Sequence, residues 1–234
     1  MDGQASVTRI DGVRGANAWL VATLEGLVLV DTGLPGNGRR VIAYLEARGH
    51  SVRDLRGVVL THGDPDHTGS AAELRALTGV PVAIHAHDAN VLAGGLTPRR
   101  AKGALRLRTF PHRLARLGHE LGMCMALRFA SRSGWRPLRA DVLLRHGDTF
   151  AGLRAIHVPG HTAGSIALAR EDGALFAGDA VFGDGLGRAH YPPRATALDP
   201  EQARASALRL FALGFSVLYP GHGEPVHAVA APRA

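Results

Sequence analysis

The chain has 234 residues, 46% of them apolar, and a net charge of +7, which is the composition of an ordinary globular protein with a substantial core. Its single cysteine, Cys124, excludes an internal disulfide and fits a reducing cytoplasm. The most apolar early stretch, residues 19–30, is short and interrupted by Glu25. We therefore expect neither a secretion signal nor a membrane span, and a cytoplasmic location.

Short apolar runs alternate with amphipathic runs over the first third of the chain. The pattern predicts strands at residues 19–23, 27–30, 58–60 and 80–84, and helices at residues 39–48 and 70–77. In the second helix, Ala71, Leu74 and Leu77 share one face.

Residues 88–140 break this alternation. Apolar residues recur there at steps of three and four, which marks one face of a helix: Phe110, Leu114, Leu117, Leu121 and Met125. We predict an inserted helical lid that covers the mouth of a site. Contact with a membrane or with a second copy of the chain also fits such a stripe, and the oligomeric state stays open.

The positive charge is concentrated in this insertion. Residues 98–139 contain eleven basic residues and one acid, Glu120. A segment of this kind can attract acidic lipids, nucleic acid or anionic substrates. However, all basic residues of the chain except Lys102 are arginine, and few aromatic residues accompany them here for stacking on bases. We therefore expect a small-molecule substrate rather than nucleic acid.

The alternation returns after residue 140. It predicts strands at residues 153–158, 165–169, 174–176 and 217–219, and a helix at residues 200–213. The chain thus consists of two similar β-rich blocks with helices outside. The predicted fold is α/β, with two sheets packed face to face and helices on both flanks, in a single domain over residues 1–234.

The most informative run is Thr61-His62-Gly63-Asp64-Pro65-Asp66-His67, which directly follows an apolar stretch. A tight loop with two carboxylates and two imidazoles repels itself or leaves groups unpaired unless cations hold it together. Three further segments each place a His or an Asp at a glycine turn, and these residues are His161, Asp179 and His222. The set predicts a metal site, against the alternative that these residues are structural.

Together these motifs resemble the metallo-β-lactamase superfamily, whose pattern is His-x-His-x-Asp-His followed by single His, Asp and His ligands. Order and context match from His62 to His222, and the one departure is Asp64, which stands where the family usually has its second His. The resemblance implies a four-layer αββα sandwich with the metals at one edge between the sheets. It also implies a hydrolase of the glyoxalase II-like or lactonase-like branch.

The resemblance further implies two divalent metal ions, and zinc is the metal expected before any other. One ion would be held by His62, Asp64 and His161, the other by Asp66, His67 and His222, with Asp179 bridging them. Asp66 and Asp179 are thereby expected to serve catalysis. A water or hydroxide between the ions would be the nucleophile, and one ion would polarise the scissile carbonyl.

Asp64 changes the expected character of the site. An Asp oxygen lies as many bonds from Cα as the Nδ1 atom through which the family's second His binds, so reach is preserved. A third carboxylate beside Asp66 and Asp179 offsets more metal charge and favours harder ions such as Fe or Mn. Alternatively, Asp64 does not bind, and the first site is weak or empty.

Other polar residues have more modest expectations. Asp31 ends a strand and resembles the family's Asp that orients a liganding imidazole, although a buried turn role is also open. Lone histidines near strand ends are usually only hydrogen-bonded, and we assign His85, His87, His146 and His157 to this class. His190 and Tyr191 are candidates for lining the substrate pocket.

The predicted activity is hydrolysis of a small ester, thioester or lactone. Within the same fold the alternatives are a phosphodiesterase or nuclease and an iron-dependent sulfur dioxygenase, because fold does not fix substrate. A metal-stabilised binding module with a decayed site is the alternative that is not an enzyme. Six of the seven ligand positions are intact, which speaks against decay.

Overall fold

Two six-stranded sheets form the centre of the protein in this computed structural model, which describes residues 6–95 and 134–227. The first sheet has the strand order β1(Val7–Arg9), β2(Trp19–Thr23), β3(Gly26–Val30), β4(Leu55–Leu60), β5(Val82–His85), β6(Val142–Leu144). The second has the order β14(Val226–His227), β13(Val217–Pro220), β10(Ala174–Gly178), β9(Ile166–Ala169), β8(Leu153–His157), β7(Thr149–Phe150). A separate hairpin pairs β11(Phe182–Gly183) with β12(Ala189–His190).

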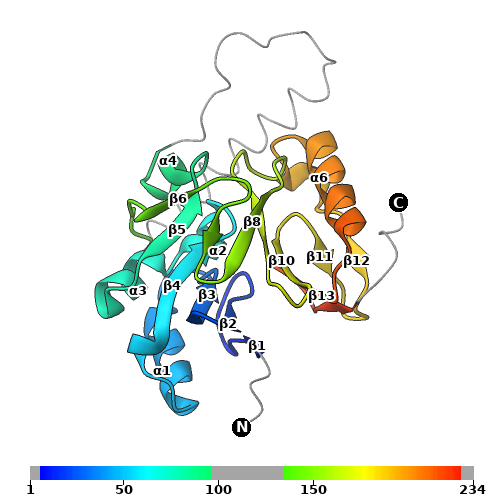
Figure 1. Cartoon of the computed structure of the whole chain (residues 1–234). Helices are drawn as coiled ribbons and strands as arrows, with labels where there is room; N and C mark the ends of the chain where they lie inside the picture. Colours follow the sequence, from blue (N-terminus) through cyan, green and yellow to red (C-terminus); the bar gives the residue numbers. More distant parts are fainter. Residues whose placement is uncertain (1–5, 96–133, 228–234) are drawn as a thin grey trace.

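Helices cover the outer face of each sheet. On the flank of the first sheet lie α1(Gly38–Ala47), α3(Ala71–Thr78) and α4(Ala89–Leu92), and on the flank of the second lies α6(Pro200–Leu213), as Figure 1 shows. Single turns complete the fold at η1(Val52–Asp54), α2(Pro65–Thr68) and η2(Arg194–Thr196). None of the helices in the described ranges is long and apolar enough to cross a membrane.

Alternation along the strands explains why four layers form. In β4, Val58 and Leu60 point to the cluster beneath the helices of the first flank, whereas Val59 points to the cluster between the sheets. In β9, Leu168 lies between the sheets and Ala167 packs towards α6. Strands buried on both faces need apolar residues at every position, as these have. The predicted αββα sandwich is confirmed.

The long elements agree with the sequence prediction, and the short ones were missed. β2 and α6 have the predicted bounds, and the other predicted strands and helices differ by a few residues at their ends. The prediction lacked β1, β6, β7, β14 and the hairpin β11–β12. Each has two or three residues, too few for a period to be visible in the sequence.

Both ends of the predicted insertion belong to the sandwich. Leu92 of α4 and Leu138 are buried in the first core, and the Leu138 N–H donates to the Leu92 carbonyl at 2.8 Å. Trp135 is buried as well, and its indole N–H donates to the Thr68 hydroxyl at 3.3 Å. The predicted lid helix, with its apolar stripe from Phe110 to Met125, lies outside the described residues.

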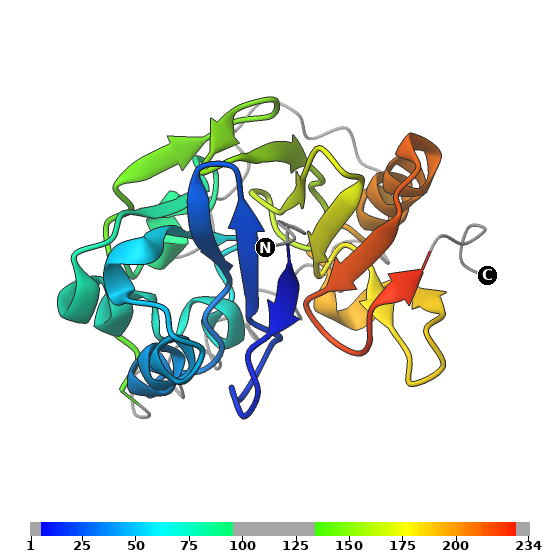
Figure 2. The same cartoon turned by 60° about the horizontal axis from the view of Figure 1, so that its bottom comes forward.

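The N-terminal hairpin ties the two sheets together. The Trp19 indole donates to the carbonyl of Pro220, at the end of β13, at 3.1 Å, and the Asn17 N–H donates to the Gly221 carbonyl at 2.7 Å. Figure 2 shows the blue β1–β2 segment beside the red end of the second sheet. These bonds fix the edge at which the candidate site residues gather.

The inner cluster can be tested with a matched pair of leucines. Leu168 is fully buried between the sheets, whereas Leu208 on α6 is 43% exposed. Leu168→Ala should lower the free energy of unfolding by about 2–5 kcal/mol, because a cavity remains. Leu208→Ala should change it by less than about 0.5 kcal/mol. Urea denaturation measures both, and equal losses would contradict the assignment of the core.

Candidate metal centre

The predicted ligands sit in loops that follow parallel strands. The run from His62 to His67 follows β4, and α2 starts within it at Pro65, where a proline suits the first helical turn. His161, Asp179 and His222 follow β8, β10 and β13. These three strands run in one direction, since β10 is parallel to β13 while β8 and β10 are both antiparallel to β9. Their loops therefore meet at one edge.

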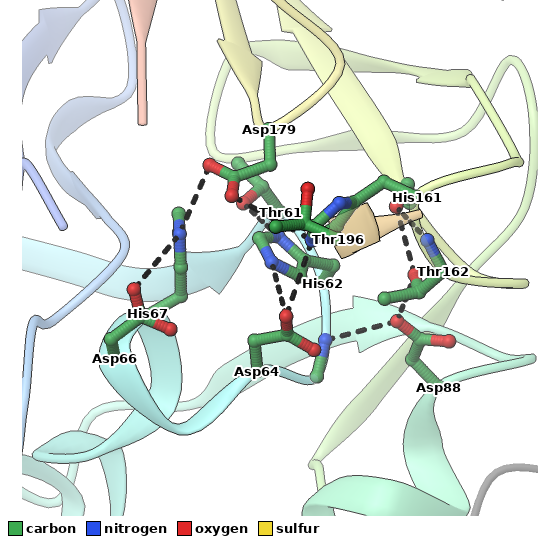
Figure 3. A network of polar contacts seen from close by, with 12 residues as sticks. Thr61, His62, Asp64, Asp66, His67, Asp88, His161, Thr162, Asp179 and Thr196 are labelled. Carbon is green, nitrogen blue, oxygen red and sulfur yellow. Dashed lines mark hydrogen bonds and ion pairs between the residues drawn. The ribbon is translucent and has the colours of Figure 1, made fainter. Parts of the chain in front are cut away.

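The loops bring the ligands into two adjoining groups. His62, His161 and Asp179 form one, and Asp66, His67 and His222 the other; in each, one candidate ligand atom per residue lies within 4.8 Å of the others. Asp179 faces both, with Oδ2 3.6 Å from His161 Nε2 and Oδ1 3.2 Å from His67 Nε2 (Figure 3). All seven predicted residues lie at this edge of the sandwich.

Asp64 lies beside the first group. Its Oδ2 atom is 3.2 Å from His161 Nε2 and 3.6 Å from His62 Nε2, and its side chain is 18% exposed (Figure 3). The carboxylate therefore points at the same two imidazole nitrogens that face Asp179. This is the position in which Asp64 can act as a ligand in place of an imidazole.

Asp31 fixes the tautomers of two imidazoles. Its Oδ2 accepts the Nδ1–H of His67 at 2.8 Å and the Thr61 hydroxyl proton at 2.8 Å. Because that hydroxyl proton is used, the Thr61 oxygen accepts the Nδ1–H of His62 at 3.0 Å. Both Nε2 atoms therefore turn to the common space of the two groups. The predicted orienting role of Asp31 matches this geometry, and the part of Thr61 was missed.

The two groups fit divalent metal ions. Four buried atoms of these groups and of the adjoining Asp64 have no hydrogen-bond partner among the described residues: His62 Nε2, Asp64 Oδ1, His67 Nε2 and Asp179 Oδ1. Buried polar atoms are nearly always paired, and leaving one unpaired costs about 1–3 kcal/mol. Imidazole nitrogen and carboxylate oxygen are ligands of zinc, iron and manganese. Bound ions would satisfy the atoms that the protein leaves unpaired.

The charges of the site also prepare it for cations. Burial alone would lower the pKa of His67, but Asp179 and Asp31 outweigh it and hold this pKa well above its usual value. Burial would raise the pKa values of Asp179 and Asp64, but the neighbouring imidazoles outweigh it and hold both below their usual value. The carboxylates are therefore ionised at neutral pH, and a metal ion must compete with protons for His67.

Two further features hold the ligand loops in place. Asp88, the residue before α4, accepts the Gly63 N–H at 2.9 Å and the Thr162 hydroxyl proton at 2.6 Å, and so connects the loops of His62 and His161 (Figure 3). A Cβ on Gly221 would collide with Asp179 Oδ1 and His67 Cε1, so only glycine fits there. Neither residue was singled out from the sequence, although Gly221 belongs to the glycine turn at His222.

The remaining polar candidates lie in other contacts. His190 pairs with Asp184 at 3.0 Å, and Tyr191 packs against the third core cluster with the Arg204 guanidinium over its ring. These contacts give neither residue a place in the two groups. His85, His87 and His157, expected to be isolated structural histidines, instead lie together.

Comparison with known proteins places the chain in a family. The sequence model of the metallo-beta-lactamase superfamily matches residues 11–222. The probable metallo-hydrolase YflN of Bacillus subtilis (strain 168) is 30% identical over 220 residues, covering 86% of this chain and 77% of that protein. The chain belongs to the metallo-β-lactamase superfamily. Family and site together are those of a metal-dependent hydrolase.

More specialised relatives match over part of their length. A thioesterase, pkgB, of Emericella nidulans (strain FGSC A4) is 28% identical over 92% of this chain and 47% of its own. A hydroxyacylglutathione hydrolase of Shewanella baltica (strain OS223) is 32% identical over 66% of this chain and 43% of its own. The chain thus spans about half the length of these two relatives.

A solved structure shows the same fold. TTHA1623 in a di-iron-bound form superposes with a TM-score of 0.66 at 24% identity, over 95% of this chain and 94% of that one. At 24% identity this structural similarity establishes the fold alone, which is the two-sheet sandwich with helices outside.

The orienting role of Asp31 predicts a large effect of one amide. All three groups that contact this carboxylate donate a proton to it, so the NH₂ of an asparagine would face a donor. Asp31→Asn should weaken metal binding about 10–100-fold. Asp184→Asn, in the β11–β12 hairpin, is the matched control and should bind as the wild type does. Competition with a chromophoric chelator measures the metal affinity of both variants. Equal affinities of Asp31→Asn and the wild type would contradict the orienting role of Asp31.

Proposed function

We propose that the protein hydrolyses a small ester, thioester or lactone with two divalent metal ions at this edge. The observation that carries the proposal is the pair of adjoining His/Asp groups, in which the buried atoms His62 Nε2, His67 Nε2 and Asp179 Oδ1 have no hydrogen-bond partner among the described residues. One ion would be held by His62, Asp64 and His161, and the other by Asp66, His67 and His222, with Asp179 between them. Such ions supply a Lewis acid for the carbonyl and lower the pKa of water.

The protein's own residues divide the remaining tasks. Asp31 and Thr61 orient the imidazoles, and Asp88 and Gly221 set the spacing of the loops. The first group is nearly closed, whereas the side chains of Asp66 and His222 are 37% and 33% exposed. We infer that the substrate approaches from this open side. There the Phe182 ring, 5.2 Å from the His222 ring, offers an apolar wall.

The substrate class rests on the relatives. One is named a thioesterase and another a hydroxyacylglutathione hydrolase, and both are hydrolases with organic substrates. The same proposal includes a small-molecule substrate and a cytoplasmic location. It also includes zinc as the metal expected before any other. Asp64 favours iron or manganese over zinc more than an imidazole would, because a carboxylate is a harder ligand.

The experiment is metal analysis followed by a substrate panel. We expect close to two transition-metal ions per chain and turnover of at least one ester, thioester or lactone. His67→Ala and Asp179→Ala should lower kcat/KM by at least about a thousandfold with loss of metal, because each removes a proposed ligand. His227→Ala, an exposed histidine on β14 outside the two groups, is the matched control and should keep activity.

Other outcomes would overturn the proposal. Cleavage of phosphodiesters alone would establish a phosphodiesterase, and oxygen consumption with an iron-loaded protein would indicate a dioxygenase. Bound metal without turnover of any substrate would leave the metal-stabilised binding module, and absence of firmly bound metal under metal-replete conditions would overturn the metal centre itself.

Asp64 can be tested by restoring the family's histidine. Asp64→His removes one negative charge, so it should keep both metals, shift their preference towards zinc and lower the pH at which the rate rises. Asp64→Ala should lose one metal. Metal content and pH–rate profiles of the three proteins decide the matter. An alanine variant with two metals and an unchanged profile would show that Asp64 is not a ligand.

A further inference from the structure

Three histidines outside the two groups meet at the ends of two strands. His85 is the last residue of β5 and His157 the last of β8, so the cluster connects the two sheets, and His87 follows two residues after β5. One ring nitrogen of each lies within 4.8 Å of the others. The rings of His85 and His157 stack with centroids 4.2 Å apart, and the ring of His87 stands nearly perpendicular to that of His85 at 4.9 Å.

The hydrogen bonds of the cluster leave lone pairs on two of these rings. The Ala163 carbonyl accepts the Nε2–H of His157 at 2.9 Å and, at 3.4 Å, the Nδ1–H of His87. An N–H directed at a backbone carbonyl fixes the tautomer, so His157 keeps its lone pair on Nδ1 and His87 on Nε2. Histidines that bind metals usually have this arrangement, with the second ring nitrogen held by a carbonyl or carboxylate.

His85 completes the set from the buried side. Burial, with smaller effects of His157 and His87, lowers its pKa to about 4, so the ring is neutral at physiological pH and offers a lone pair. Its Nδ1 accepts the backbone N–H of His87 at 3.2 Å, which is long for such a bond. A metal ion on this ring either replaces that N–H at Nδ1 or displaces the proton of Nε2. Both are ordinary costs of metal binding.

The surroundings suit a cation with neutral ligands. The carboxylates of Asp148 and Asp88 act on His85 and His157 and favour positive charge there, while Arg145 and Arg209 act in the opposite sense. His85 is buried, His157 half-buried and His87 exposed, so solvent reaches one side of the cluster. Three imidazoles with one open position form a ligand set that zinc occupies in proteins.

We propose that His85, His87 and His157 form a third metal site, separate from the two groups at Asp179, for one divalent transition-metal ion of the kind that prefers imidazole, such as Zn²⁺. Ligand nitrogens about 2 Å from a tetrahedral ion lie about 3.4 Å apart, so nitrogens that lie within 4.8 Å of one another must approach by up to roughly 1.4 Å. Because an imidazole lone pair lies in the plane of its ring, the His157 ring must also turn out of its 10° stack on His85 to share one ion with it. His157 is half-buried and His87 exposed, so both rings can turn against the buried ring of His85. A bound ion would tie β5, β8 and, through Ala163, the loop of His161 together.

The test counts zinc in two proteins that differ at an exposed position. Wild type and His87→Ala are dialysed to equilibrium against the same series of free Zn²⁺ concentrations, and bound zinc is measured per chain. His87→Ala should hold one ion fewer. His227→Ala, an exposed histidine on β14, is the matched control and should equal the wild type. Because the two groups at Asp179 are unaltered in all three proteins, the difference does not depend on how many ions they hold.

A second measurement reads the rings directly. In long-range ¹H–¹⁵N spectra of the histidine side chains, Zn²⁺ should shift His157 at Nδ1 and His87 at Nε2. Circular dichroism confirms that His87→Ala is folded. Equal zinc content of His87→Ala and wild type, or unshifted His157 and His87 nitrogens at saturating Zn²⁺, would overturn the third site while leaving the proposed hydrolase untouched.

Discussion

The carboxylate of Asp31 is the interaction on which the site depends. It is buried at the end of β3, with a φ of 59° that few residues other than glycine tolerate, and it accepts three hydrogen bonds. Since a carboxylate only accepts, it orients His67 directly and His62 through Thr61. One buried charge thus turns two lone pairs towards the same space, which the sandwich core could not do.

Strand direction provides the second constraint. The loops of His62, His161, Asp179 and His222 follow strands of two sheets, and they meet because the N-terminal hairpin bonds to the end of β13. Close backbone approach is part of this design: the Cβ of any other residue at position 221 would occupy the space of Asp179 and His67. Packing between the sheets and the spacing of the metal groups are therefore set by the same contacts.

The third cluster follows from the same architecture. β5 and β8 belong to different sheets, and their last residues, His85 and His157, stack because the sheets close on each other at this end. Ala163, whose carbonyl accepts both His157 and His87, lies two residues after His161. The proposed third site and the Asp179 groups therefore share one loop, and order in one supports order in the other.

The sequence by itself predicted the layer order, the long elements and the seven residues that meet at this edge, because burial on both strand faces and polar runs at strand ends are local patterns. For Asp64 the sequence showed only that its side chain is long enough to replace a histidine ligand. The structure places this side chain beside His62 and His161. The sequence did not predict the hydrogen bonds of Thr61 and Asp88. It also did not predict that His85, His87 and His157 lie together. Hydrogen-bond direction and contact between separate sheets are properties of the tertiary structure, which alone decided them.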